Sequence, residues 1–463
     1  MPDTNDTPAT PEPAQAPADP ATQPGGATRR TFIKGTTAAG ITAALASTGI
    51  GSTAFAQGGD TVRVGLVGCG GRGTGAAHNA IEASSGVVLH AMGDLYEDRL
   101  NGSANNLQQN TGEAFQVGNR KYTGWDAYQQ VINADVDLCI FATPPQFRPK
   151  MVKAAVEAGK HVFFEKPVAV DPAGCRTIME AGDIANENGI GMVCGTQRRH
   201  QKGYVDAMEA IHNGAIGEVV GAQVFWQQGG LWNRGRQESW TNLDWQLRNW
   251  LYFTWLSGDH IVEQHVHNID VALWAFQDQA PVKAYGNGGR QQRTGEEWGH
   301  GNDHFSLQIM MPGFGRMINS HCRQIPGCDN HVGEEIIGTE GYARMGGTST
   351  LVNLAGERIE QFRGGRDPYV QEHADLVASF RAGEPINEAH RIAQTTLTAI
   401  ICREAAYSGK NIDYNWALNE STQNLGPGEA PDCYTSGLTE AHIENAEDLA
   451  TPPVYIPGAY QMP

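Results

Sequence analysis

The side chains best suited to acid–base chemistry are Glu263 and His267, which stand four positions apart. If residues 261–274 form a helix, the Cβ atoms of this pair lie ~5–6 Å apart on one face. His260 extends the same face, whereas His265 points elsewhere on the helix. A histidine titrates near neutral pH and a carboxylate can orient it. This face is therefore a candidate for giving or taking a proton.

A further candidate for proton transfer is Lys166, in the stretch Glu165-Lys166-Pro167. It follows the apolar run 161–164, which has the composition of a buried strand. An isolated lysine is usually a solvated surface residue. A lysine at the carboxyl end of a parallel strand, however, stands where open α/β sheets bind their ligands. We therefore expect Lys166 to act on a bound molecule.

The spacing of the metal-ligand residue types argues against a metal site. His260-x-x-Glu263 is followed by Gln264, so the HxxEH pattern is broken, and no HExxH occurs. The eight cysteines include no CxxC pair and match no zinc spacing. A bridge between Cys322 and Cys328 stays open, since a disulfide would persist outside the cytoplasm. We expect no metal.

A glycine-rich turn that follows the first apolar strand predicts dinucleotide binding. The alternating strand Val62–Val67 leads into Gly68-x-Gly70-x-x-Gly73 and then into a helix of small residues. The first glycine permits a tight turn, the second lets backbone approach a pyrophosphate, and the third lets helix and strand pack closely. The amino end of the helix then offers free N–H groups to the phosphates.

The second strand supports this interpretation and bears on the choice of cofactor. It ends at Asp94, 21 residues after Gly73. A carboxylate at this position accepts hydrogen bonds from ribose hydroxyls and repels a 2′-phosphate, which favours NAD over NADP. Arg99 lies close by in the sequence and keeps NADP as an alternative.

Strand-like and helix-like segments continue to alternate to about residue 197, which predicts a doubly wound parallel (Rossmann) sheet. Ligands of such sheets bind beyond the carboxyl ends of the strands, so the turns after successive strands should share one crevice. The expected cofactor-binding residues are Gly68, Gly70, Gly71, Arg72, Gly73, Asp94, Thr143, Pro144, Glu165 and Lys166.

The ordered set of motifs resembles the Gfo/Idh/MocA family, which includes glucose–fructose oxidoreductases and inositol dehydrogenases. The matching stretches are the glycine-rich strand, "ATPP", "GKHVFFEKP", "TQRR", "NGAIGEVVGAQVFW" and "HNIDVALW". The resemblance implies a second α/β domain with a large, mostly antiparallel open sheet that is often used for oligomerisation, so we expect a homo-oligomer. It divides the chain into residues 57–197, the dinucleotide domain, and 198–463, the substrate domain.

The resemblance also implies that Lys166 faces the nicotinamide and the reacting hydroxyl, and that its bond to Pro167 is cis. The family usually has an aspartate four residues before the histidine that aligns with His267. This sequence has Glu263 there, and His265 where a glycine is common. A glutamate reaches further, so its carboxylate could approach from another angle.

These residues suit the oxidation of a secondary alcohol, in which a hydride leaves carbon and a proton leaves oxygen. The cofactor accepts the hydride, and the protein must handle the proton. Lys166, His267 and Glu263 are the expected catalytic residues. We expect His267 to be the base and Lys166 to polarise the oxygen, while the reverse assignment stays open.

A tryptophan-rich segment, residues 225–255, indicates a sugar or cyclitol as substrate, because aromatic faces and polar side chains together fit a polyhydroxylated ring. Several of these tryptophans should simply pack in the interior. The candidate substrate-contacting residues are Gln197, Arg198, Tyr204, Trp232, His260 and Arg323, with His304 as a further possibility.

The amino terminus predicts export in the folded state. Residues 28–34, TRRTFIK, form a twin-arginine motif, and a weakly apolar stretch ends in Ala54-Phe55-Ala56 before Gln57. Residues 1–27 are rich in Pro, Ala and Thr and should be disordered. We therefore expect residues 1–56 to be an n-region plus signal peptide, the twin-arginine machinery to be a partner, and the mature chain to be periplasmic.

Export in the folded state has a consequence for the cofactor. Nicotinamide nucleotides are made in the cytoplasm, so an exported protein that needs one must fold around it and keep it. We expect a tightly bound NAD, or NADP, that is re-oxidised in place during oxidation of a sugar, glycoside or cyclitol hydroxyl. Two alternatives are a redox-neutral NAD-dependent glycosidase working through a transient keto sugar and a non-catalytic sugar-binding protein.

The charge of the chain limits its other partners. The formal net charge is −18 at pH 7 over 463 residues. Such an excess of acidic groups argues against nucleic acid or an anionic membrane as a partner. No stretch after the signal is long and apolar enough to span a bilayer.

Overall fold

The computed structural model describes residues 61–423, 425 and 454–463, so the predicted signal peptide lies outside the described residues. The first domain is built on a six-stranded sheet with the order β3-β2-β1-β4-β5-β6, all pairs parallel. This order and direction confirm the predicted Rossmann sheet. Its strands are β1 (Val62–Val67), β2 (Val87–Asp94), β3 (Lys121–Thr123), β4 (Leu138–Phe141), β5 (His161–Phe164) and β6 (Met192–Cys194).

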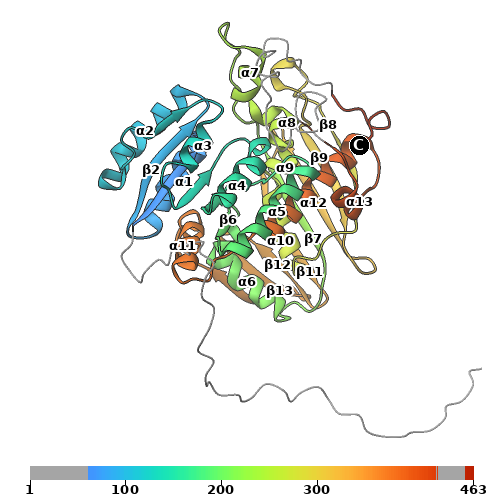
Figure 1. Cartoon of the computed structure of the whole chain (residues 1–463). Helices are drawn as coiled ribbons and strands as arrows, with labels where there is room; N and C mark the ends of the chain where they lie inside the picture. The colour runs from blue at the N-terminus through green and yellow to red at the C-terminus, as the bar shows by residue number, and fades with distance from the viewer. Residues whose placement is uncertain (1–60, 424, 426–453) are drawn as a thin grey trace, which may run out of the picture. The chain divides into compact units, whose positions relative to one another are not determined.

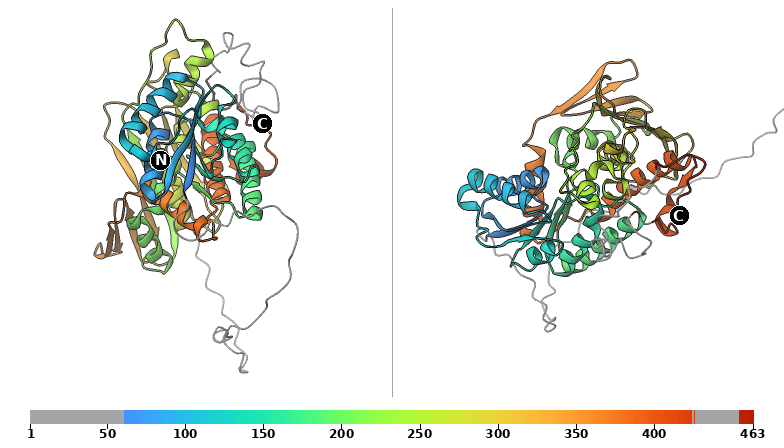
Figure 2. Two further views of the ribbon diagram at one scale, coloured as in Figure 1. Left: turned by 60° about the vertical axis from the view of Figure 1, so that its left-hand side comes forward. Right: turned by 90° about the horizontal axis from the view of Figure 1, so that it is seen from above.

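Strands β1, β4 and β5 of this sheet are buried on both faces, as their apolar runs require. Helices pack against both faces of the sheet (Figures 1 and 2). The last of these helices begins after Asp171, whose carboxylate accepts a hydrogen bond from the amide of Gly174 at 3.2 Å, and ends at Gly189. The helices are α1 (Gly71–Ala83), α2 (Glu97–Thr111), α3 (Ala127–Ile132), α4 (Arg148–Glu157) and α5 (Pro172–Asn188).

The second domain is built on a nine-stranded sheet in which all pairs are antiparallel except β7 with β10. The strand order is β14-β13-β12-β11-β7-β10-β9-β8-β15, which confirms the expected large, mostly antiparallel sheet. Its strands are β7 (Val219–Gln228), β8 (Lys283–Gly289), β9 (His304–Met310), β10 (Met317–Gln324), β11 (His331–Gly338), β12 (Gly341–Met345), β13 (Thr348–Asn353), β14 (Arg358–Arg363) and β15 (Ile412–Asp413).

Helices cover one face of this sheet. α12 (Ala389–Ser408) packs on β8 and β9, α10 (Val266–Ala275) on β7 and β11, and α6 (Lys202–His212) on β13 and β14. The strands alternate accordingly: in β10 every second side chain is buried beneath the helices. In Figure 2 the first sheet and the large sheet flank these helices. α12 also contacts α5, so this helix lies between the large sheet and the first domain.

The chain returns to the first domain after the large sheet. α11 (Pro368–Arg381) lies beside α1, and its side chains Leu376, Val377 and Phe380 belong to the same apolar cluster as β1 (Figure 1). Residues 382–388 connect α11 to α12. The second ends at Gly409, which has a left-handed conformation with φ of 69°.

Among residues 61–423, 425 and 454–463, no helix combines the length and apolar character needed to cross a membrane. Cys322 is buried on β10, while Cys328 is exposed, and both are free thiols. The bridge that the sequence left open is therefore absent.

Candidate active site

The glycine-rich turn after β1 has the geometry that its three glycines predict. Gly68 has φ of +93°, and a Cβ there would lie 2.7 Å from the backbone of Ala142. A Cβ at Gly73 would lie 1.8 Å from the carbonyl oxygen of Gly68. At Gly70 and Gly71, by contrast, a Cβ would meet no atom within 4 Å. The turn is thus closely packed at Gly68 and Gly73 but open at Gly70 and Gly71. The open part lies at the amino end of α1, where the backbone fits a pyrophosphate.

Asp94 ends β2 and faces this turn. Its carboxylate accepts hydrogen bonds from the amides of Cys69 at 2.6 Å and Tyr96 at 2.9 Å. Burial raises the pKa of Asp94, while the two amide hydrogen bonds act in the opposite direction. Backbone groups therefore fix the carboxylate in the position expected of a ribose acceptor.

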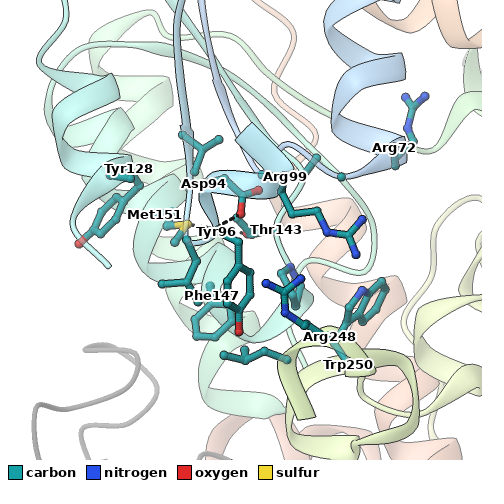
Figure 3. Close-up of a pocket in the computed structure, with 18 of the residues that line it drawn as sticks. Arg72, Asp94, Tyr96, Arg99, Tyr128, Thr143, Phe147, Met151, Arg248 and Trp250 are labelled. Carbon is teal, nitrogen blue, oxygen red and sulfur yellow. Dashed lines mark hydrogen bonds between the residues drawn. The ribbon is translucent and has the colours of Figure 1, made fainter. Parts of the chain in front are cut away.

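A cavity of about 470 Å³ opens in front of the turn and Asp94. Figure 3 shows Arg248 and Trp250, from the second domain, facing Asp94, Tyr96 and Arg99 of the first. A cavity of this size is appropriate for part of a dinucleotide. Residues of the expected cofactor set that line it are Gly68, Gly70, Gly71, Arg72, Asp94, Thr143 and Pro144.

Lys166 follows β5, and its bond to Pro167 is cis, as the resemblance implied. The ammonium group donates hydrogen bonds to both the carbonyl oxygen and the carboxylate of Glu263, the latter at 3.0 Å. Both side chains are largely buried, with 13 and 15% of their surface exposed. The structure thus brings together two of the three expected catalytic residues, one from each domain.

The predicted continuous helix over residues 261–274 is wrong. The structure has two helices, α9 (His260–Glu263) and α10, separated at Gln264 and His265. At the break the amide of His267 donates to the carbonyl of Gln264, at 3.4 Å. The carbonyl oxygen of Glu263 instead accepts from Lys166. An apolar stripe at helical spacing, Val262, Val266, Ile269 and Leu273, continues through both helices, so the sequence pattern alone could not show the break.

His267 lies at the start of α10, with its ring stacked on Trp226 of β7 at a centroid distance of 5.8 Å. Burial lowers the pKa of His267 well below 6.5, and the positive charges of Lys166 and Arg198 lower it further. The imidazole is therefore neutral at physiological pH, which is the form that accepts a proton.

His260 and His265 are both buried. The ring of His260 contacts Asp259 and Phe305, whereas the carboxylate of Glu263 contacts Lys166. His265 is buried, and its Nε2 lies 2.9 Å from the Ser320 hydroxyl on β10. Burial lowers the pKa of His265 to about 3.

A buried carboxylate that sequence analysis missed, Glu334 of β11, organises the candidate substrate residues. Arg198 forms an ion pair with it, the Tyr204 hydroxyl lies 3.1 Å away, and the Asn268 amide donates to it at 2.6 Å. The Arg198 guanidinium also lies 5.6 Å from the centre of Trp226. The only signal in the sequence was an acidic residue at an inward-facing position of a strand.

Arg72, in the glycine-rich turn, connects the two domains in an unexpected way. It pairs with Glu165 and with Glu372 of α11, the second at 3.2 Å, and lies over the ring of Tyr369. Burial raises the pKa of Glu372 well above 4.5. Glu372 is 300 positions from Arg72, so no local pattern could reveal this contact.

The remaining candidates are dispersed. Trp232 lines the cavity in front of the glycine turn. Gln197 donates to the Tyr369 hydroxyl at 3.2 Å, Arg323 donates to the carbonyl of Asp329, and His304 is 2.8 Å from the Asp303 carboxylate. Within the described part of the chain, no group of three or more His, Cys, Asp or Glu side chains is arranged to hold a metal ion.

Two family profiles match the chain and together cover more than half of it. Residues 62–189 match the oxidoreductase family with an NAD-binding Rossmann fold. Residues 204–344 match the GFO/IDH/MocA C-terminal domain. The two matches fall on the two domains described above.

Curated relatives include inositol dehydrogenases. The inositol 2-dehydrogenase of Salmonella typhimurium (strain LT2) is 27% identical over 227 residues, which is 49% of this chain and 58% of that enzyme. The chain thus spans little more than half of this relative. The myo-inositol 2-dehydrogenase of Thermotoga maritima is 22% identical over 339 residues, or 70% of this chain and 90% of the enzyme.

Solved structures share the fold at low sequence identity. The scyllo-inositol dehydrogenase of Lactobacillus casei, solved with NAD(H) and scyllo-inositol, has a TM-score of 0.59 at 19% identity. It aligns with 77% of this chain and 99% of its own. A levoglucosan dehydrogenase in complex with NADH and levoglucosan has a TM-score of 0.60 at 18% identity, over 76 and 99% of the two chains. With both domains matched in order, the chain belongs to the Gfo/Idh/MocA family of oxidoreductases.

Proposed function

We propose that this protein oxidises a secondary hydroxyl of a sugar, glycoside or cyclitol with a nicotinamide dinucleotide that stays bound through the reaction. The observation that carries the proposal is the meeting of Lys166 and Glu263 across the domain boundary, with a neutral His267 stacked on Trp226. The names of the inositol and levoglucosan dehydrogenases support this substrate class.

The residues that would hold the dinucleotide are the open turn at Gly70 and Gly71 and the carboxylate of Asp94. When bound, the nicotinamide supplies the hydride acceptor. Backbone amides already occupy one lone pair of each Asp94 oxygen, and the remaining lone pairs are free for ribose hydroxyls. This arrangement favours NAD over NADP, because a 2′-phosphate would meet a carboxylate.

The protein's own groups would divide the proton transfer. Lys166 donates a hydrogen bond to the reacting oxygen and stabilises the negative charge that develops there. His267, neutral because of burial, accepts the hydroxyl proton. Glu263 holds the ammonium of Lys166 in place. The face of Trp226 lies beside His267 and could support the C–H face of a ring.

Two measurements test the proposal. Purified protein is denatured and the released small molecules are identified by mass spectrometry; we expect about one nicotinamide dinucleotide per chain, with NAD predominating. Native protein is then mixed with inositols, hexoses and glycosides while nicotinamide fluorescence is recorded. A rise with one of these compounds is expected, and absence of any bound or bindable dinucleotide would contradict the proposal.

The same material separates net oxidation from the glycosidase alternative. A nitrophenyl glycoside is incubated with the protein without an added electron acceptor. Release of nitrophenol over many turnovers would favour the redox-neutral glycosidase. We expect no release beyond a single turnover.

We further propose that the chain is exported folded by the twin-arginine route, which its TRRTFIK motif supports. Replacing Arg29 and Arg30 by lysine is expected to leave the protein, with its dinucleotide, in the cytoplasmic fraction. Equal amounts of the parent and the variant in the periplasmic fraction would rule out this route.

A further inference from the structure

One wall of the dinucleotide cavity comes from the second domain. We call residues 231–252 the wall segment; it contains α7 (Asn242–Arg248) and the turn η4 (Trp250–Tyr252). Its side chains Trp232, Arg234, Leu247, Arg248 and Trp250 line the cavity opposite the glycine turn and Asp94.

Polar contacts join the wall segment to the loop after β2. The Arg248 guanidinium makes two hydrogen bonds to the Asp98 carboxylate, at 3.0 and 3.1 Å, and lies 4.0 Å from the centre of the Tyr96 ring. The Tyr96 hydroxyl donates to Asp244 at 2.8 Å. Tyr96 and Asp98 immediately follow Asp94, so these contacts bridge the crevice at the end that Asp94 marks.

Apolar packing continues the same junction. Phe147 of the first domain is buried in one cluster with Leu243, Trp245 and Leu247 of the wall segment, and Tyr96 and Trp125 pack against it. This cluster is separate from the cores of the two sheets. The wall segment therefore has its own core, composed of side chains from both domains.

The wall segment is also braced by internal hydrogen bonds. The side chain of Asn249 bonds to both the amide and the carbonyl of Arg234, at 2.9 and 3.1 Å. The Tyr252 hydroxyl donates to the carbonyl of Trp232 at 2.6 Å. Thr241 and Asp244 form a capping box at the start of α7.

We propose that the wall segment closes the dinucleotide crevice, and that the Asp98–Arg248 and Tyr96–Asp244 contacts limit the rate at which the dinucleotide leaves. A dinucleotide lying between Asp94 and the wall segment can depart only when these contacts open. The inference rests on the proposed use of a dinucleotide and adds the device that retains it.

Exchange of the bound nucleotide tests the proposal without measuring activity. Purified protein is incubated with excess isotopically labelled NAD, and the unlabelled dinucleotide still bound is measured by mass spectrometry over time. The variants are Asp98→Asn, which removes the ion pair, Tyr96→Phe, which removes the bond to Asp244, and the two combined. Asp206→Asn is the matched control, because it removes the exposed pair between Lys202 and Asp206 elsewhere.

We expect each single variant to exchange about two- to fivefold faster, as for a partly exposed contact, and the double variant about tenfold faster. Added salt should speed exchange in the parent protein, because it screens the ion pair between Asp98 and Arg248. It should have much less effect on Asp98→Asn, which lacks this pair. The control should match the parent in both respects, and melting curves confirm that all variants are folded.

The outcomes are distinct. Unchanged exchange rates in the folded double variant would overturn the role of the wall segment and leave the proposed function standing. A protein that neither carries nor binds NAD would overturn both. Equal acceleration in Asp206→Asn would show a general effect of charge and would also overturn the role of the wall segment.

Discussion

Lys166 interacts with two other expected catalytic residues, Glu263 through hydrogen bonds and His267 through its charge. Its ammonium contacts both the carbonyl and the carboxylate of Glu263, while its charge lowers the pKa of His267. In the proposed mechanism this ammonium would polarise the reacting oxygen. Burial, together with the charge of Lys166, keeps the imidazole of His267 neutral.

Replacing Lys166 by methionine should separate binding from chemistry. The side chain is about the same length but carries no charge, so we expect kcat to fall by roughly 10²–10⁴. Although Lys166 was among the expected cofactor-binding residues, it does not line the cavity in front of the glycine turn, so the dinucleotide should remain bound in the amount found for the parent. Lys202→Met, at an exposed lysine, serves as control. Full activity of Lys166→Met would contradict its catalytic role.

The lowered pKa of His267 predicts an acid-tolerant oxidation. The neutral imidazole is the reactive form, and a lowered pKa means that it persists as pH falls through 6.5. The rate should therefore hold between pH 8 and 6.5 and decline only in more acidic solution. A lysine base is mostly protonated at neutral pH. A rate that rises steeply through the alkaline range would assign the base to lysine instead.

At the scale of elements, the break between α9 and α10 determines which group the carbonyl of Glu263 contacts. It releases the carbonyl of Glu263 toward Lys166, and it is anchored from behind by His265, which is bonded to Ser320 and close to Asn268. A buried histidine at the break is thus held by a hydroxyl of strand β10.

Ser320→Ala should therefore weaken both the fold and the site. It leaves the buried Nε2 of His265 without its partner, which typically costs about 1–3 kcal/mol of unfolding free energy. The matched control is Ser306→Ala, because Ser306 contacts His321 at 3.1 Å in an exposed pair. Denaturant titration measures both variants. Equal losses in the two would show that the anchor has no special role.

At the scale of the whole molecule, residues 454–463 pack against the buried cluster that contains Tyr407. The ring of Tyr455 stacks on Tyr407 at 4.4 Å, and the Tyr460 hydroxyl donates to Glu404 at 2.8 Å. Tyr407 in turn donates to Asp259, the residue that caps α9. The last residues of the chain thus contact the helix that carries Glu263 through one intermediate side chain.

Tyr455→Ala should lower the stability of the whole protein. Loss of a stacked, partly buried aromatic ring is expected to cost about 1–3 kcal/mol. Ile456→Ala, at a neighbouring side chain that is 64% exposed, should cost much less. Thermal melting of the two variants gives the comparison, and equal shifts in melting temperature would contradict the argument.

The sequence predicted best those features that are local or set by repeated patterns. The glycine turn, the strand ending at Asp94 and the lysine after β5 each follow from patterns that are local in the sequence. Contacts between distant positions were missed. Arg72 reaches Glu372, and Arg248 reaches Asp98 across 150 positions. The break before α10 was missed because the apolar stripe continues through it, while the contact of His265 at the break is with Ser320, on the distant strand β10.

The return of α11 to the first sheet has a consequence for synthesis of the chain. Glu372 of α11 forms an ion pair with Arg72, which lines the cavity in front of the glycine turn, and the apolar face of α11 packs on the first sheet. A ribosome must therefore translate through residue 381 before the amino-terminal half can assemble fully. A chain truncated before α11 would lack both the partner of Arg72 and the apolar side chains that this helix packs on the first sheet.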